Sequence, residues 1–326
     1  MRKSVSNWCW LMQWCFLVLI TVLITVSCGN NQAQQTASFD AKSSDSSCRI
    51  IQHAMGEICV PKNPKRVVTL STENLSNAIV LGIKPVGSAT SFDTTLPSYL
   101  QGKTEGMTTI GTDEQPSIEA IALLKPDLII GVKSPHEAIY PLLSKIAPTA
   151  LYDWQSDETW RDQFSFVAEV LGRREAAQQA WTRYYQRIED LKLALGNKYQ
   201  NKTISFVYYY FGRLGSDTKN SFIGSILSDV GLKRPPSQAV IAPYGSIEYS
   251  EEKLEQIDGD FLFLTAFSDN DEESLKRLLQ KPLFKQLKAV QQNHVYFVDK
   301  LTWVGWNLFA ADAVIDDLYK YLVNTP

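Results

Sequence analysis

Short runs of aliphatic residues alternate with segments of helical periodicity along most of the chain. Strands are predicted at residues 67–70 and 127–130, and a helix at residues 74–81 lies between them. The same alternation returns between residues 203 and 298. Strands that alternate with helices predict an α/β fold whose sheets are mainly parallel.

A long helical segment separates the two alternating regions. Over residues 157–195 the apolar side chains recur at intervals of three and four, and Gly172 is a candidate kink near the middle. The pattern divides the chain into a first lobe at 48–156, an interlobe helix at 157–196 and a second lobe at 197–326. We expect each lobe to contain a mainly parallel sheet flanked by helices.

One short pattern occurs in both lobes. Residues 117–127 and 250–260 each place Ser, Glu, two aliphatic residues and Asp at identical spacing. In each copy the Ser is predicted to cap a helix that turns tightly into a buried strand. The repeat fits two similar α/β lobes that face one another.

The first 27 residues have the three parts of a signal peptide. Arg2 and Lys3 form a short positive region, residues 8–26 contain no charged side chain, and the small residue Ser27 ends the segment. The apolar run is also long enough to cross a bilayer, so an uncleaved membrane helix is the alternative. The polar sequence that follows favours the signal peptide.

A tether is predicted at residues 28–47. The segment begins with Cys28 and continues with many Gln, Asn and Ser and almost no bulky apolar side chain, so it cannot bury a core. A small residue before a Cys that starts such a tether is typical of bacterial lipoproteins. Thr25 departs from the aliphatic residue usual three positions before that Cys. We expect Cys28 to be lipidated and to anchor the protein at the extracytoplasmic face of the cytoplasmic membrane.

The cysteines fit an exported protein. Of the five, Cys9 and Cys15 lie in the signal peptide and Cys28 is the predicted anchor. The remaining pair, Cys48 and Cys59, lies at the two ends of a predicted hairpin. An even pair in an oxidising compartment favours a disulfide, and two free core thiols are the alternative.

Charge and motif content argue against several functions. The formal net charge is −3 and no basic run occurs, so nucleic-acid binding is not expected. The sequence has no nucleophile elbow, phosphate-binding loop or dinucleotide-binding glycine set, so we do not expect an enzyme. Its three histidines, His53, His136 and His294, are too few and too scattered to favour a bare zinc or manganese site, which is a minor alternative.

Six segments occur together in a specific order and spacing. They are HAMGE (53–57), VPKNPKRVVTL (60–70), LGIKPVGSA (81–89), IGTDEQPSIEAIALLKPDLIIG (110–131), FIGSILSDVGLKRP (222–235) and AADAVIDDLYKYL (310–322). Together they resemble the iron-siderophore substrate-binding proteins of ABC importers. The resemblance implies two lobes joined by one rigid helix, with a shallow cleft that binds an iron(III)–siderophore complex. It further implies a monomer without a cofactor that delivers this ligand to an ABC permease dimer.

The resemblance also implies a docking role for Glu119 and Glu252, one on each lobe. In the family such carboxylates form salt bridges with Arg residues of the two permease subunits, and pairs of this kind fix orientation and steer encounter. The alternative is that each carboxylate, in the first turn of its helix, only favours the helix dipole.

The ligand should lie against aromatic walls and a few charged groups, without direct protein ligands to the iron. Arg213 follows a predicted strand in a Gly-flanked loop, at the end where such sheets bind ligands, and its guanidinium suits a carboxylate. The aromatic candidates are Trp154, Tyr209, Tyr210, Tyr244, Trp303 and Trp306. For each of them, simple packing is the alternative.

The first-lobe loop at residues 111–115 contains acids where hydroxamate-binding relatives often have an Arg. Lys133, Ser134 or Asn74 would then supply the polar contacts of this lobe. The acids tell against a strongly anionic ligand seated on it. Mixed citrate–hydroxamate siderophores are implied by resemblance alone, and cobalamin or haem bound by the same fold is the alternative.

Overall fold

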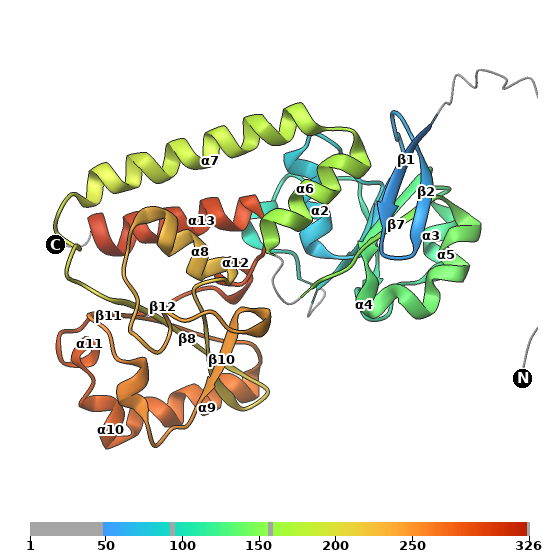
Figure 1. The fold of residues 1–326 in the computed structure, drawn as a ribbon. Coiled ribbons are helices and arrows are strands. Elements are labelled where there is room, and N and C mark those ends of the chain that lie inside the picture. Colours follow the sequence, from blue (N-terminus) through green and yellow to red (C-terminus); the bar gives the residue numbers. More distant parts are fainter. Residues whose placement is uncertain (1–47, 92–94, 156–158, 325–326) are drawn as a thin grey trace, which may run out of the picture. The chain divides into compact units, whose positions relative to one another are not determined.

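The first lobe contains a parallel sheet with helices on both faces (Figure 1). The computed structural model describes residues 48–91, 95–155 and 159–324, and the strand order of this sheet is β5-β4-β3-β6-β7. Its strands are β3 (Val67–Thr69), β4 (Gly87–Thr90), β5 (Thr108–Thr112), β6 (Leu128–Val132) and β7 (Thr149–Tyr152). Its helices are α2 (Thr72–Val80), α3 (Ile118–Leu123), α4 (Lys133–His136) and α5 (Tyr140–Ile146), with 3₁₀ turns η1 (Ser98–Leu100) and η2 (Glu137–Ile139).

The second lobe is built on a mixed sheet of order β10-β9-β8-β11-β12. Its strands are β8 (Ile204–Tyr210), β9 (Arg213–Asp217), β10 (Ser246–Tyr249), β11 (Phe261–Ala266) and β12 (Val295–Phe297). Its helical elements are α8 (Phe222–Val230), η3 (Pro243–Gly245), η4 (Leu254–Ile257), α9 (Asp269–Gln280), α10 (Pro282–Lys285), α11 (Lys288–Gln291), α12 (Lys300–Trp303), α13 (Leu308–Leu318) and the π-helical turn η5 (Tyr319–Val323).

Strand direction differs between the two sheets. The α/β fold and the parallel sheet are confirmed in the first lobe, whereas in the second lobe β9 and β10 run antiparallel to their neighbours. A two-residue turn at Phe211 and Gly212, both with positive φ, returns the chain directly beside β8. So short a connection allows only antiparallel pairing.

Alternate strand residues enter different hydrophobic cores. In the first lobe, Val68 and Ile129 pack under α3 and α5, while Val67 and Leu128 face α2 and α6 (Trp160–Leu171). In the second lobe one face of the sheet packs on α9 and the other on α8 and α13, as Figure 1 shows. The inner faces of both sheets belong to one continuous cluster of buried residues. The two lobes therefore share a core.

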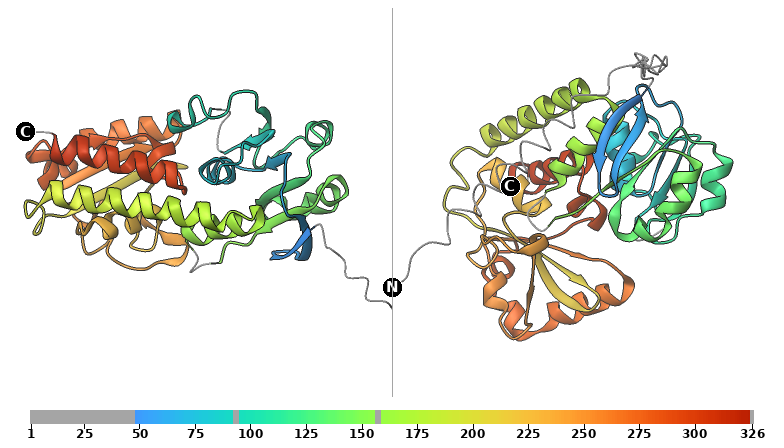
Figure 2. Two further views of the ribbon diagram at one scale, coloured as in Figure 1. Left: turned by 90° about the horizontal axis from the view of Figure 1, so that it is seen from above. Right: turned by 45° about the vertical axis from the view of Figure 1, so that its right-hand side comes forward.

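The segment predicted as one interlobe helix forms two helices in the structure. Helix α6 ends at Gly172, whose φ of +67° is left-handed, and α7 (Arg174–Leu195) follows. The guanidinium of Arg49 donates to the carbonyls of Glu169 and Val170 at 2.6 and 2.8 Å, so it caps the broken end of α6. The 22 residues of α7 lie against α8 and α13 (Figures 1 and 2).

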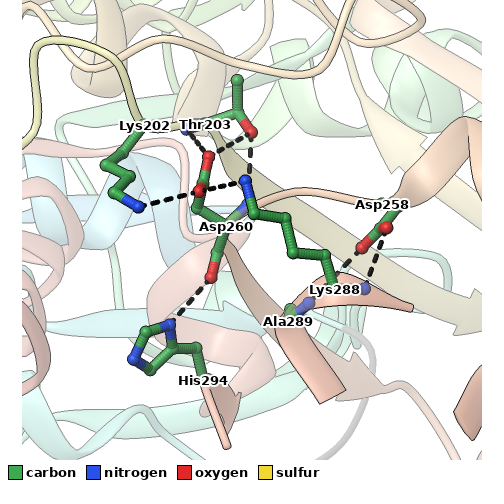
Figure 3. A network of polar contacts seen from close by, with 7 residues as sticks. All are labelled: Lys202, Thr203, Asp258, Asp260, Lys288, Ala289 and His294. Atoms are coloured by element: carbon green, nitrogen blue, oxygen red, sulfur yellow. Dashed lines mark hydrogen bonds and ion pairs between the residues drawn. The ribbon is translucent and has the colours of Figure 1, made fainter. Parts of the chain in front are cut away.

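The Asp that ends each copy of the sequence repeat has the same structural role. Asp127 accepts hydrogen bonds from the backbone of Lys65 and Arg66 at 2.6 and 2.9 Å, just before β3. Asp260 accepts one from the backbone of Thr203 at 2.9 Å, just before β8 (Figure 3). Each carboxylate thus fixes the start of a central strand.

The lysines around Asp260 change its acidity. Burial opposes its ionisation, but hydrogen bonds from Lys288, Thr203 and Lys202 outweigh burial and lower the pKa of Asp260 to about 2. The carboxylate is therefore charged at neutral pH.

The Ser of the repeat behaves differently in the two lobes. Ser117 accepts a hydrogen bond from the backbone of Ala120 at 3.2 Å and caps α3 as predicted. The second copy forms no α-helix, which corrects the sequence-based expectation. Ser250 accepts from the backbone of Glu252 at 3.3 Å in a turn, and only the 3₁₀ helix η4 follows. Asp258 follows the last residue of that helix, and its carboxylate accepts from the backbone of Lys288 at 2.9 Å.

A separate hairpin precedes the first lobe. Strands β1 (Cys48–His53) and β2 (Gly56–Pro61) pair antiparallel, and the predicted disulfide between Cys48 and Cys59 is confirmed. The turn of the hairpin is fixed to β7, since the backbone N–H of Ala54 donates to the carbonyl of Leu151 at 2.9 Å.

No helix within the described ranges 48–91, 95–155 and 159–324 is long and apolar enough to cross a membrane. The predicted signal peptide, Cys28 and the tether lie outside the described residues.

Replacing Cys48 and Cys59 together by Ser should lower the free energy of unfolding by about 2–3 kcal/mol, because the disulfide closes a short loop in the unfolded chain. Urea denaturation of the variant and of the oxidised wild type measures this loss. Reduced wild-type protein is the control and should match the variant. Equal stability of all three proteins would contradict a structural role for the disulfide.

Candidate functional site

A cavity of about 430 Å³ lies between the two lobes. The first lobe lines it with Val132 at the end of β6 and Trp154 just after β7, and Gln163 of α6 joins them. The second lobe contributes Tyr208 near the end of β8 and Phe267 directly after β11. The cavity thus collects the carboxyl ends of parallel strands from both sheets, where α/β folds bind ligands.

Aromatic side chains form much of the wall, namely Trp154, Tyr208, Tyr210, Tyr244, Phe267 and Trp306. Trp154 of the first lobe and Trp306 of the second meet edge to face, with ring centroids 5.2 Å apart. Phe267 lies between the rings of Tyr208 and Tyr210, at 5.7 and 5.0 Å. These rings offer flat apolar surfaces to a ligand.

Two of these aromatic residues have strained backbones. Tyr244 and Trp306 have φ angles of +54° and +52°, a region that bulky side chains rarely adopt. Phe211, which lines the neighbouring hollow, has a φ of +49°. Strain of this kind costs about 1–3 kcal/mol for each residue and gathers at functional sites.

Three carboxylates also line the cavity: Glu73 in the first turn of α2, Asp113 in the loop after β5, and Asp217 at the end of β9. Burial raises the pKa of Glu73 and of Asp113. Ser91 donates to Glu73 at 3.1 Å. Among the described residues, the lining contains no Arg, Lys or His.

His136 positions the loop that contains Asp113. Its ring is buried, and its Nδ1 and Nε2 lie 2.8 and 2.9 Å from the carbonyl oxygens of Val132 and Asp113. Burial lowers the pKa of His136, and a neutral ring has a single N–H. Nε2 therefore donates to the carbonyl of Asp113, and Nδ1 accepts from the backbone N–H of Val132 at 3.3 Å, which links β6 to the loop.

Asp217 is the most enclosed of the three carboxylates, with 4% of its surface exposed. Burial raises its pKa to about 6, although Arg234 lies close enough to favour the charged form. Arg234 is itself buried and donates to Thr218, Ser216 and Gln238, and burial lowers its pKa to about 10. Oδ2 of Asp217 has no hydrogen-bond partner among the described residues.

Several residues predicted from sequence do line the cavity: Trp154, Tyr210, Tyr244, Trp306 and Ser134. Lys133 is not part of the wall, although both of its chain neighbours are, and its ammonium lies 3.1 Å from Asp153. Asn74 is buried and accepts a hydrogen bond from Gln163 at 3.2 Å.

Arg213 lines an adjoining hollow that shares Tyr208, Tyr210 and Ser246 with the cavity. Its guanidinium is 70% exposed and lies 2.9 Å from a carboxylate oxygen of Glu248. Its side chain therefore lies at the outer edge of the site and already has an anionic partner.

Two aromatic candidates are corrected. Tyr209 is buried on the opposite face of β8, where its hydroxyl bonds Glu251, because successive residues of a strand point to opposite faces. Trp303 is fully buried, stacks on Phe263 with centroids 4.5 Å apart and donates from Nε1 to Asp317 at 2.8 Å. Neither side chain lines the cavity.

The sequence analysis missed several lining residues, notably Glu73, Gln163, Tyr208, Asp217 and Phe267. For Phe267 a signal was available in the sequence, because this residue directly follows the carboxyl end of a buried strand. Glu73 lies in the first turn of a helix, where an acid has an ordinary structural explanation, and Asp217 ends a strand that the sequence analysis did not predict.

No cluster of three or more metal-ligating side chains occurs in the part of the chain that the structure describes. Each histidine makes a local contact instead. His53 accepts from the backbone of Leu151 at 3.2 Å, and Nδ1 of His294 lies 3.0 Å from the carbonyl of Asp260.

Comparison with known proteins agrees with this architecture. A family model described as periplasmic binding protein matches residues 67–301. The probable siderophore-binding lipoprotein YfiY of Bacillus subtilis (strain 168) is 33% identical over 322 residues, covering 95% of this chain and 97% of that protein. The Fe(3+)-citrate-binding protein YfmC of the same strain is 31% identical over 312 residues, covering 94% and 96%. The structure of Staphylococcus aureus SirA complexed with staphyloferrin B superposes with a TM-score of 0.72 at 27% identity, covering 84% of this chain and 98% of that one.

The raised pKa of Asp217 predicts how stability depends on pH. Its value is about 6 in the folded protein against an ordinary 3.8, so the folded chain binds this proton more tightly than the unfolded chain does. As the pH falls from 7 to 4, this carboxyl therefore adds up to about 3 kcal/mol to the free energy of unfolding. The Asp217→Asn variant has no carboxyl group at this position, so its free energy of unfolding does not increase in this way.

The difference in unfolding free energy, wild type minus Asp217→Asn, should accordingly rise as the pH falls through this window. Urea denaturation of both proteins at several pH values measures the difference, and groups common to both cancel. A difference that stays constant or falls on acidification would contradict the raised pKa.

Proposed function

The chain belongs to the periplasmic binding protein family, and from this premise we propose that it captures a ferric siderophore outside the cytoplasm and delivers it to the permease of an ABC importer. The observation that carries the proposal is the aromatic cavity, with three carboxyl groups in its wall, between two lobes that share one core. The family is one of binding proteins, and capture followed by release requires no catalysis.

The walls of the cavity suit a chelate whose iron is already fully coordinated. Aromatic rings pack against the organic shell of such a ligand, while hydroxyl and carboxylate groups contact its polar edge. The volume of about 430 Å³ lies within the range of roughly 300–1,000 Å³ common for small-molecule sites. The adjoining hollow with Arg213 would hold a part of the ligand that extends beyond the cavity.

Only small movements of the lobes are proposed on binding. Helices α2, α6, α7 and α13 belong to the core that both lobes share, so a wide opening would expose buried apolar surface. Bonds at the lobe junction support this. The hydroxyl of Tyr99 contacts the carbonyl of Leu301 at 3.3 Å and accepts from Asn307 at 3.1 Å.

Delivery is proposed to use Glu119 and Glu252. Both side chains are exposed, and neither lines the cavity. Glu119 lies in the first turn of α3 on the first lobe, and Glu252 lies in the turn between β10 and η4 on the second. Carboxylates placed in this way are free to pair with Arg side chains of the two permease subunits.

A lipid on Cys28 would keep the binding lobes close to that permease. The anchor is part of the proposal because the cysteine lies outside the described residues. The predicted tether after it, up to residue 47, would separate the lipid from the first strand of the hairpin. A monomer is the proposed state, with one copy delivering one ligand.

A titration against a panel of ligands tests the capture function. The panel contains ferric hydroxamates, ferric citrate, ferric catecholates, haem and cobalamin, and quenching of the intrinsic tryptophan fluorescence is the measurement. Trp154 and Trp306 line the cavity, so a bound ligand should quench them. Saturable binding of at least one ferric siderophore is expected; binding of haem or cobalamin alone would contradict the proposal.

Reversing both docking charges, Glu119→Arg with Glu252→Arg, should abolish uptake of the ferric siderophore by cells. Ligand affinity of the purified variant should be unchanged, because both side chains are exposed and lie outside the cavity wall. Glu273→Arg on the exposed side of α9 is the matched control and should transport normally. Loss of ligand affinity in the double variant would contradict the docking role.

A further inference from the structure

We propose that the site selects ferric siderophores with a net positive charge, supplied by a protonated amine, over neutral and anionic ones. The inference rests on the proposed function, since it specifies the class of ligand for the same cavity. Its basis is the combination of three carboxylates, several aromatic rings and no cationic side chain in the described wall.

The negative groups are spread over both lobes. Glu73 and Asp113 line the cavity from the first lobe, and Asp217 lines it from the second. The segments 92–94 and 156–158, which the structure does not describe, have the sequences FDT and SDE and so contain no cationic residue. A ligand that enters the cavity therefore meets carboxyl groups of both lobes.

Two cations behind the cavity wall already donate to other groups. Arg234, behind Asp217, donates to Ser216, Gln238 and the carbonyl of Thr218. Lys300 donates to the carbonyl of Phe267 at 2.7 Å. Neither lines the cavity, so neither offers a free positive group to an anionic ligand.

Lys133 and Arg213 lie at the margins of the site with carboxylate partners of their own. The Lys133 ammonium is 3.1 Å from Asp153, and the Arg213 guanidinium is 2.9 Å from Glu248. Each pair has no net charge. The cations at the edge therefore do not offset the carboxylates in the wall.

The helix N-termini beside the cavity are also filled by the protein's own acids. Glu73 lies in the first turn of α2, where its own backbone N–H and Ser71 partly offset the effect of burial on its pKa. The backbone N–H of Ile223 in the first turn of α8 and Ser221 likewise favour the charged form of Asp217, against the effect of burial on its pKa. Helix N-termini ordinarily attract anionic ligands. Here the carboxyl groups of Glu73 and Asp217 already lie near these N-termini, so an anionic ligand would gain little from them.

One acceptor remains without a partner. Asp217 is 4% exposed and lines the cavity, and its Oδ2 makes no hydrogen bond to the described residues. A buried carboxylate oxygen without a donor is costly, and an ammonium group supplies up to three donors together with the opposite charge.

The aromatic rings fit the same ligand. An ammonium is attracted to the faces of Trp and Tyr rings within about 6 Å, and recognition of amines often combines such rings with carboxylates. Trp154, Trp306, Tyr210 and Tyr244 surround the cavity, and Tyr244 is 70% exposed. Its ring is therefore available to a ligand.

Two ferric chelates that differ only in charge provide the test. Ferrioxamine B is a linear ferric trihydroxamate with one terminal amine and carries a charge of +1 at neutral pH; its N-acetylated form is neutral. Ferric citrate serves as the anionic chelate. Tryptophan quenching of the full-length protein at pH 7.5 should give an affinity for the amine form about tenfold or more above that for the acetylated form, and ferric citrate should bind more weakly than either.

Two isosteric variants locate the source of the preference. Asp217→Asn and Asp113→Asn should each reduce the ratio of the two trihydroxamate affinities at least threefold, because the amine form loses a charged partner that the acetylated form never had. Glu273→Gln removes a negative charge from the exposed part of α9, outside the cavity, and should leave the ratio unchanged. Circular dichroism and the binding of the neutral chelate show whether each variant is folded.

The outcomes separate this inference from the proposed function. Equal affinity for the amine and acetylated forms, or stronger binding of ferric citrate, would overturn the charge preference while siderophore capture stands. A preference that persists unchanged in both Asp variants would also overturn it. Failure of every ferric chelate to bind would instead contradict the proposed function itself.

Discussion

The packing of α7 and α8 around Trp160 of α6 is the contact on which the rest of the arrangement depends. The Trp160 ring is fully buried, lies 5.3 Å from the rings of Trp181 and Phe222, and donates from Nε1 to Ser225 on α8 at 3.0 Å. Because helices from both lobes share this core, the lobes cannot separate widely without exposing it. The cavity is therefore preformed, and little ordering free energy is lost when a ligand enters.

The parts of the fold that depend on the pattern of neighbouring residues in the sequence could be predicted. Alternating aliphatic and helical segments predicted the α/β lobes, and the repeated Asp127 and Asp260 marked equivalent strand starts. The tight return of β9 and the early end of the second repeat depend on contacts with distant segments, such as that of Asp258 with the backbone of Lys288. No local pattern in the sequence records those contacts.

The site could be predicted only in part, because its aromatic residues lie in runs that look alike. In the sequence Tyr-Tyr-Tyr-Phe, residues 208–211, no polar alternation shows that Tyr209 faces the core. Trp303 and Trp306 are three residues apart, yet the single turn of α12 buries the first and a left-handed backbone turns the second to the cavity. The acidic loop at 111–115 was the sequence feature that best indicated the chemistry of the site. Its Asp113 lines the cavity together with two further carboxyl groups, those of Glu73 and Asp217.

The edge-to-face contact of Trp154 with Trp306 joins the two lobes directly across the cavity. Two indoles at this separation couple their electronic transitions, so the near-ultraviolet circular dichroism of the unliganded protein should contain a contribution that belongs to the pair. A ligand that slides between the rings removes that contribution, whereas one that binds only in the outer hollow leaves it intact. The circular dichroism of this tryptophan pair therefore reports how deeply a chelate binds in the cavity.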